Sequence, residues 1–123
     1  MKGRIFKFNP KNEPINGNMD NFLNNIVMNR DNTQIILTDK YGGISRSVAY
    51  NSIDENDIIF IQSYGYITHY MYCNIKGPNL KNNRKEISIK NINKIEKPIY
   101  SRYRNQTFNI LDKDTVKKLL NQI

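Results

Sequence analysis

Apolar residues change their spacing along the chain, and each change predicts a different element. Residues 3–8 alternate apolar and basic, which indicates a short strand that ends at Asn9-Pro10. The segment 16–30 has helical spacing instead, with apolar residues at i, i+3, i+4, i+7 and i+8: Met19, Phe22, Leu23, Ile26 and Val27. This pattern predicts an amphipathic helix capped by Asn16 or Asn18.

The middle of the chain is predicted to form mainly strands. Residues 33–39 indicate one strand, and 40–52 a loop whose Gly42-Gly43 pair allows unusual backbone angles. The continuous apolar run 58–61 is typical of a central strand that is buried on both faces. A tight turn near Tyr64-Gly65 then predicts an antiparallel hairpin with the strand that follows.

The last third adds strands and a terminal helix. A basic loop over 76–85 precedes a strand over 86–95, whose inward residues are Ile87 and Ile89, with Ile92 as a third candidate. A short strand follows at 108–110. Residues 111–123 predict a helix that is capped by Asp112 and buries Val116, Leu119 and Leu120.

These elements predict one small α+β domain over residues 1–123, without repeats or an internal boundary. Strands outnumber helices, so we expect a curved mixed sheet or pseudobarrel of five or six strands with two flanking helices.

Tyrosines fall at even positions in the segment 63–77, which reads SYGYITHYMYCNIKG. Because side chains alternate across a strand, Tyr66, Tyr70 and Tyr72 are predicted on one face of the sheet. The aliphatic residues Ile67, Met71, Cys73 and Ile75 then form the core on the other face. Two interpretations are open: the rings stack unpaired bases, or they lie under a helix with their hydroxyls at its edge.

The charge of the chain favours a polyanionic partner. The formal net charge is +8 and the estimated pI is about 9.6. Basic residues concentrate between residues 76 and 104, whereas acidic residues gather at 54–57 and near the C-terminus. Such a polarised charge distribution is typical of proteins that bind nucleic acid, and an anionic membrane is the second candidate partner. Alternatively, the positive charge serves only to keep the protein in solution. The segment 99–107 adds Tyr and Arg in alternation, suited to base and phosphate contacts or to a solvated strand end.

Candidate chemistry is sparse. Cys73 is the only cysteine and His69 the only histidine, and both are predicted on the core face, where a thiol is inert. The acidic turn 54–57 lacks the further ligands that a hard cation needs, and no phosphate-loop motif occurs. We therefore predict no catalysis, no cofactor and no metal. The polar residues 1–12 and the absence of a long apolar run predict a cytoplasmic protein.

Three stretches in this order resemble EVE-type domains of the PUA-like superfamily. RIFKFNPKN (4–12) is similar to their first strand, and residues 42–78 are similar to their middle section, with an Arg-containing loop and an acidic turn before an apolar strand. IEKPIYSRYRNQTFNILDKDTVKKLL (95–120) is similar to their last strands and helix. The chain departs from the family in having Asn56 where a Gly often precedes the Asp, and in having no Trp.

The resemblance implies a cleft that receives a flipped-out, often modified, base. The family positions map onto Lys7, Asn9, Ile44, Ser45, Arg46, Gln62 and Ser63, with Tyr64 and Tyr66 in place of the missing Trp. Phosphate contacts are expected from Arg46, Arg102, Arg104 and the basic loop with Arg84 and Lys85, beside Tyr103.

The primary hypothesis is thus a non-catalytic reader of DNA or RNA, with no membrane partner. An alternative is a small protein-interaction factor, such as an inhibitor or adaptor of a mobile element or defence system, because Tyr and Arg are common in protein interfaces. A hydrolase or nuclease comes third, since the sequence does not place the necessary carboxylates, His and Lys together.

Overall fold

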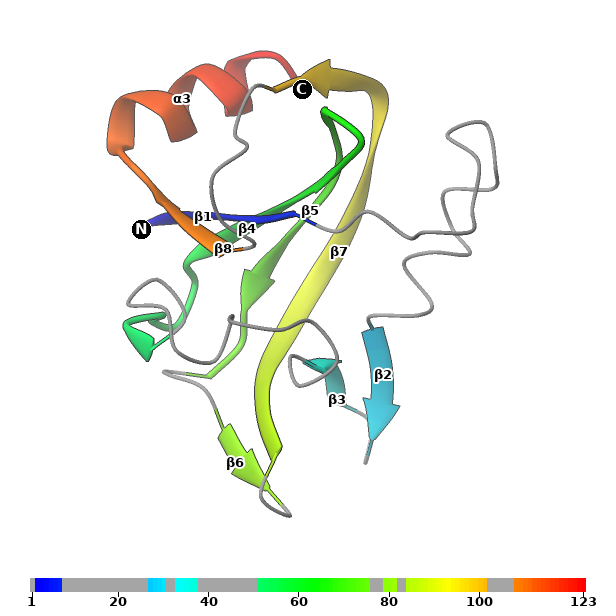
Figure 1. Ribbon diagram of the computed structural model, residues 1–123, viewed down its shortest axis with the longest axis vertical. Coiled ribbons are helices and arrows are strands. Elements are labelled where there is room, and N and C mark those ends of the chain that lie inside the picture. The colour runs from blue at the N-terminus through cyan, green and yellow to red at the C-terminus, as the bar shows by residue number, and fades with distance from the viewer. Residues whose placement is uncertain are drawn as a thin grey trace.

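The computed structural model describes residues 2–7, 27–30, 33–37, 51–75, 79–81, 84–101 and 108–123. These residues form an eight-stranded mixed sheet and the helix α3, Lys113–Asn121 (Figure 1). The strands are β1 Gly3–Lys7, β2 Val27–Arg30, β3 Thr33–Leu37, β4 Ile58–Ser63, β5 Tyr66–Cys73, β6 Asn79–Lys81, β7 Arg84–Tyr100 and β8 Phe108–Leu111.

The strands lie in the order β2-β3-β7-β5-β4-β1-β8, and β6 pairs with β7 beside this path. β1 and β4 are parallel, and the other described pairs are antiparallel. The structure therefore confirms a mixed α+β sheet. The predicted five or six strands correspond to β1, β3, β4, β5, β7 and β8, and the short strands β2 and β6 add to them.

The first predicted helix is wrong at its C-terminal end. Val27, expected on the apolar face of that helix, begins strand β2 and pairs with Ile36 of β3. The antiparallel backbone register of β2 with β3 therefore replaces the local helical period, because long-range strand pairing can override local propensity. The rest of the predicted helix, with Asn16 and Asn18, lies outside the described residues, as does the Gly42-Gly43 loop.

The predicted central strand is confirmed. All residues of β4 are buried, because β4 lies between β5 and β1 and has covered faces on both sides. The hairpin to β5 is also confirmed, with Tyr64 at φ 50° and Gly65 at φ 84° as its two turn residues. Two consecutive positive φ values match the twist of antiparallel strands, and a non-glycine residue at Tyr64 adopts this conformation at some cost.

A β-bulge in β5 overturns the predicted tyrosine face. Ile67 is paired with Gln62 and His69 with Ile61, so Thr68 is an extra residue on β5. The extra residue reverses the alternation of side chains, because two residues of one strand then face one residue of the other. Consequently Tyr70 and Tyr72 share the face of Ile67, whereas Tyr66 lies on the opposite face.

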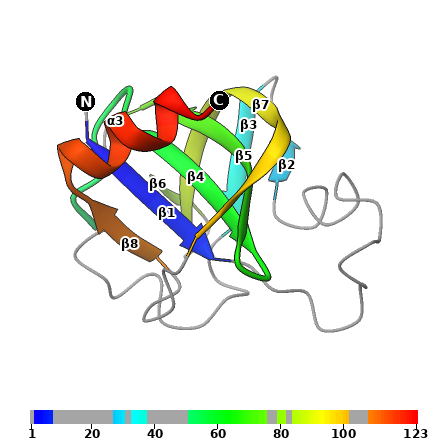
Figure 2. The ribbon, with the colours of Figure 1, turned by 90° about the horizontal axis from the view of Figure 1, so that it is seen from above.

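The helix-side core contains those half-buried tyrosines. Helix α3 crosses one face of the sheet over β1 and β4 (Figure 2). The buried cluster on this face consists of Ile5, Ile58, Phe60, Ile67, Ile95, Ile99, Leu111, Val116 and Leu119, with Tyr70, Tyr72 and Leu120 packed against it. Tyr70 and Tyr72 are therefore part of the core on the face that α3 covers, which agrees with the second interpretation of the tyrosine row.

The terminal helix is confirmed with its cap. Asp112 accepts a hydrogen bond from the Thr115 backbone N–H at 2.7 Å, which satisfies one of the donors at the start of α3. This hydrogen bond lowers the pKa of the Asp112 carboxyl from its ordinary value. Val116 and Leu119 are buried as expected, and Leu120 is half-buried.

Close contact between α3 and β1 requires glycine at position 3. A Cβ added to Gly3 would overlap Cγ2 of Val116 and lie 3.3 Å from Cβ of Leu111. We expect Gly3→Ala to lower the free energy of unfolding by about 1–3 kcal/mol through overpacking. Urea denaturation measures this loss. The double variant Gly3→Ala/Val116→Ala serves as the control, because its loss should be smaller than the sum of the single losses.

Candidate nucleic-acid interface

One end of the sheet gathers several predicted site residues. β1 and β4 run parallel and end together, with Lys7 in register with Gln62. The turn at Tyr64 follows, and Ser63 pairs with Tyr66 across the hairpin. β7 also ends here, so Tyr66 stands opposite Tyr100. We call this group the hairpin end, and it comprises Lys7, Gln62, Ser63, Tyr64, Tyr66, Tyr100 and Ser101.

The hairpin end presents an exposed aromatic pair. Tyr66 is 42% exposed and Tyr100 is 57% exposed, and their ring centroids lie 5.8 Å apart at an interplanar angle of 67°. This edge-to-face arrangement is a favourable one for two aromatic rings. The neighbouring residues Ile67 and Ile99 are buried in the core cluster, so each ring is attached to a well-anchored backbone position.

The hairpin end also contains three buried polar residues. Gln62, Ser63 and Ser101 are all buried, and the Ser101 backbone N–H donates to the Gly65 carbonyl at 2.8 Å. Ser101 Oγ has no hydrogen-bond partner within the described part of the chain. Gln62 and Ser63, which the resemblance maps onto the family's cleft, are thus buried residues of the hairpin end.

The remaining predicted residues do not join this group in the described structure. Arg84 and Lys85 begin β7, at the opposite end of that strand from Tyr100, where they pair with Lys81 and Leu80 of β6. The other predicted contacts lie outside the described residues: Asn9, Ile44, Ser45, Arg46, Arg102, Tyr103 and Arg104.

Sequence reasoning missed the partnership of Tyr66 with Tyr100. The Tyr–Arg run over 100–104 draws attention to Tyr100, but its position opposite Tyr66 follows from the register of β5 with β7. That register includes two shifts, one of them beside Asn91, which has φ 54°. The spacing of residue types along the sequence does not predict such long-range strand pairing.

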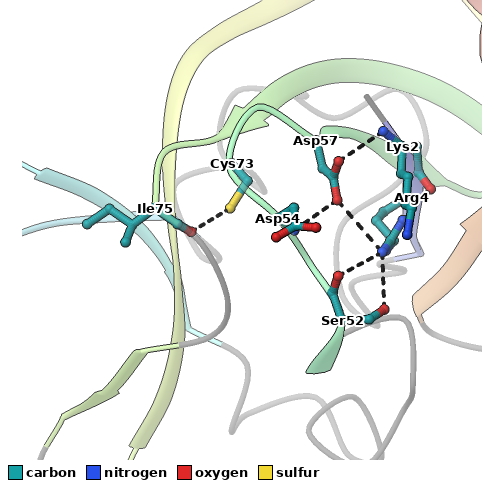
Figure 3. Close-up of polar contacts among 8 residues, drawn as sticks. Lys2, Arg4, Ser52, Asp54, Asp57, Cys73 and Ile75 are labelled. Atoms are coloured by element: carbon teal, nitrogen blue, oxygen red, sulfur yellow. Dashed lines mark hydrogen bonds and ion pairs between the residues drawn. The ribbon is translucent and has the colours of Figure 1, made fainter.

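A second polar cluster is buried at the other end of β1 (Figure 3). Arg4 is 0% exposed, in a strand whose sequence alternates apolar and basic residues. Its Nη1 donates to the Gly3 carbonyl at 3.1 Å, and its Nη2 donates to the Ser52 carbonyl at 3.3 Å and to Ser52 Oγ at 3.2 Å. Nη2 also lies 3.7 Å from Oδ2 of Asp57, which places a carboxylate beside the buried cation.

Asp57 organises the turn before β4. Its Oδ1 accepts from the Lys2 backbone N–H and its Oδ2 from the Asp54 backbone N–H, both at 2.9 Å. Burial lowers the pKa of the Arg4 guanidinium, while the nearby carboxylates of Asp57 and Asp54 act in the opposite direction. The acidic turn is therefore a structural partner of β1. Within the described residues no group of three or more His, Cys, Asp or Glu side chains is placed to hold a metal.

Cys73 and His69 lie in the interior, as predicted. The Cys73 thiol donates to the Ile75 carbonyl at 2.9 Å, and burial raises the pKa of the thiol to about 11. It is thus neutral at physiological pH and a poor nucleophile. Nδ1 of His69 is hydrogen-bonded to Thr68 Oγ1 at 2.9 Å, and both side chains are buried.

No family model matches the chain, and no curated protein or solved structure matches it either. The resemblance to EVE-type domains therefore rests on the sequence motifs alone. None of the described helices has the length and apolar character needed to cross a membrane.

Proposed function

We propose that this protein is a non-catalytic nucleic-acid-binding module whose binding surface is the hairpin end. The observation that carries the proposal is the exposed Tyr66–Tyr100 pair at the hairpin end of the sheet. Exposed aromatic rings on a rigid sheet provide stacking surfaces for bases.

Charge supports the same ligand class. The chain has a formal net charge of +8, and two lysines lie on strands that end at the hairpin end. Lys7 is half-buried at the end of β1, and Lys97 is exposed on β7 shortly before Tyr100. Lysine ammonium groups bind phosphates as point charges. Such contacts hold a nucleic-acid strand in place without distinguishing its base sequence. The sequence motifs add the finer proposal of a PUA-like, EVE-type domain that accommodates a single base.

The salt dependence of binding tests the charge argument. Neutralising these two lysines with Lys7→Gln/Lys97→Gln should reduce the slope of log Kd against log salt concentration by roughly 0.7–0.9 for each phosphate that the variant no longer neutralises. Fluorescence anisotropy with labelled DNA and RNA oligonucleotides measures that slope. The matched control Lys113→Gln/Lys117→Gln removes the same charge from α3, where both lysines are exposed, and should leave the slope unchanged.

Absence of DNA and RNA binding at low salt would overturn the proposal. The exposed tyrosine pair also favours one alternative, a protein-interaction surface, because tyrosine is enriched among interface residues that dominate binding energy. A partner that is retained from lysate after nuclease treatment, and released on Tyr66→Leu, would support that alternative.

A further inference from the structure

We infer that the ligand is an unpaired nucleic-acid strand, one of whose bases stacks on the Tyr66–Tyr100 pair. This inference rests on the proposed function and specifies its ligand class. The edge-to-face angle of 67° is the first reason. In this arrangement one ring covers at most a single face of the other, so ring surface remains for a third aromatic group. The exposures of 42% and 57% agree with such an open surface.

The tyrosine ring faces can stack on the bases of a single strand but not on bases inside a duplex. Inside a duplex both faces of every base are covered by its neighbours, and only base edges and backbone are accessible in the grooves. A stacking surface thus gains nothing from an intact duplex, whereas an unpaired base offers a free face. A duplex would have to extrude a base first, at a cost of a few kcal/mol.

The pair is held in position before any ligand arrives. Tyr66 and Tyr100 are directly opposed in the β5–β7 ladder, and the adjacent bond from Ser101 N–H to the Gly65 carbonyl closes this end of the sheet. Fixed rings lose little side-chain freedom on binding, which favours affinity.

Gly65 lies beside the Tyr100 ring. An added Cβ at Gly65 would lie 3.9 Å from Cε2 of Tyr100 and 3.9 Å from the Ser101 carbonyl oxygen. A longer side chain at this position would therefore reach the ring. The left-handed φ of 84° favours glycine here for a separate, backbone reason.

The test compares three probes of matched length: single-stranded DNA, single-stranded RNA and a blunt duplex. We expect tighter binding of at least one single strand than of the duplex at equal salt. Tyr66→Leu and Tyr100→Leu should each weaken single-strand binding by roughly 5- to 150-fold, which corresponds to about 1–3 kcal/mol for one stacked base. Tyr66→Phe retains the ring and should retain most of the affinity. Because the chain contains no Trp, quenching of tyrosine emission on binding provides a direct second readout.

Ile110→Ala is the matched control, since Ile110 is an exposed apolar residue on β8 outside the hairpin end (51% exposed). It should bind as the original protein does. Two results would overturn the inference but leave nucleic-acid binding itself established. One is that the duplex binds as tightly as the single strands or more tightly, and the other is that both Leu variants bind single strands with wild-type affinity. Failure to bind any of the three probes at low salt overturns the proposed function instead.

Discussion

Asp57→Asn is expected to lower the free energy of unfolding by about 3–5 kcal/mol, the range for breaking one partner of a buried ion pair. The substitution leaves the fully buried Arg4 guanidinium without the carboxylate 3.7 Å away. It also weakens the acceptor for the Lys2 and Asp54 backbone N–H groups. Arg4 stays protonated at any physiological pH, so the loss of a proton cannot relieve the cost of burying its charge.

Urea denaturation followed by circular dichroism measures the loss, and three further variants identify its cause: Glu55→Gln, Arg4→Met and Arg4→Met/Asp57→Asn. Glu55→Gln removes a neighbouring exposed carboxylate from the same turn and should leave the midpoint unchanged. Arg4→Met/Asp57→Asn removes the buried cation as well, and should be more stable than the sum of the two single losses implies. Wild-type stability of Asp57→Asn would show that hydrogen bonds from Arg4 to Ser52 and Gly3, and not the ion pair, determine how Arg4 is held.

Local patterns predicted most of the described strands. The apolar run 58–61 corresponds to β4, the Tyr64-Gly65 turn joins β4 to β5, and Asp112 caps α3. Each of these features depends on residues close in sequence, where turn conformation, alternation and capping decide the structure.

Features that depend on distant pairing were missed. The alternating sequence of β1 gives no sign that Arg4 is buried, but β1 lies between β4 and β8 and all of 3–6 is buried. The bulge at Thr68 separates Tyr66 from Tyr70 and Tyr72, and a bulge leaves no reliable trace in the hydropathy pattern. Of the predicted site residues, five lie at the hairpin end: Lys7, Gln62, Ser63, Tyr64 and Tyr66. Tyr100 and Ser101 join them through the long-range register of β5 with β7.

The bulge gives the two halves of the tyrosine row different roles. Tyr70 contacts Phe60 with ring centroids 6.4 Å apart and Tyr72 with centroids 6.2 Å apart, on the helix-covered face. These rings contribute to the core. Tyr66 instead contacts Tyr100 at the exposed margin. Stability and binding should therefore respond to different substitutions.

Phe60→Ala is expected to lower the free energy of unfolding by about 3–5 kcal/mol, because it removes a large side chain from a close-packed core. Phe60 is fully buried in the central strand, and its truncation also removes the aromatic contact with Tyr70. Tyr66→Ala, by contrast, should change stability by less than about 1 kcal/mol, since a partly exposed ring leaves no internal cavity. Chemical denaturation of the two variants, measured in parallel with single-strand affinity, separates the effects.

Phe60→Leu provides a graded control in case Phe60→Ala does not fold, because it retains most of the volume and should lose less stability. The folded fraction of Phe60→Leu should bind nucleic acid as the original protein does, since Phe60 lies in the core and not at the hairpin end. If Tyr66→Ala destabilised the protein as much as Phe60→Ala, the Tyr66–Tyr100 pair would be part of the structural core. Its exposure would then be no argument for a ligand, and weaker binding by the tyrosine variants would reflect unfolding.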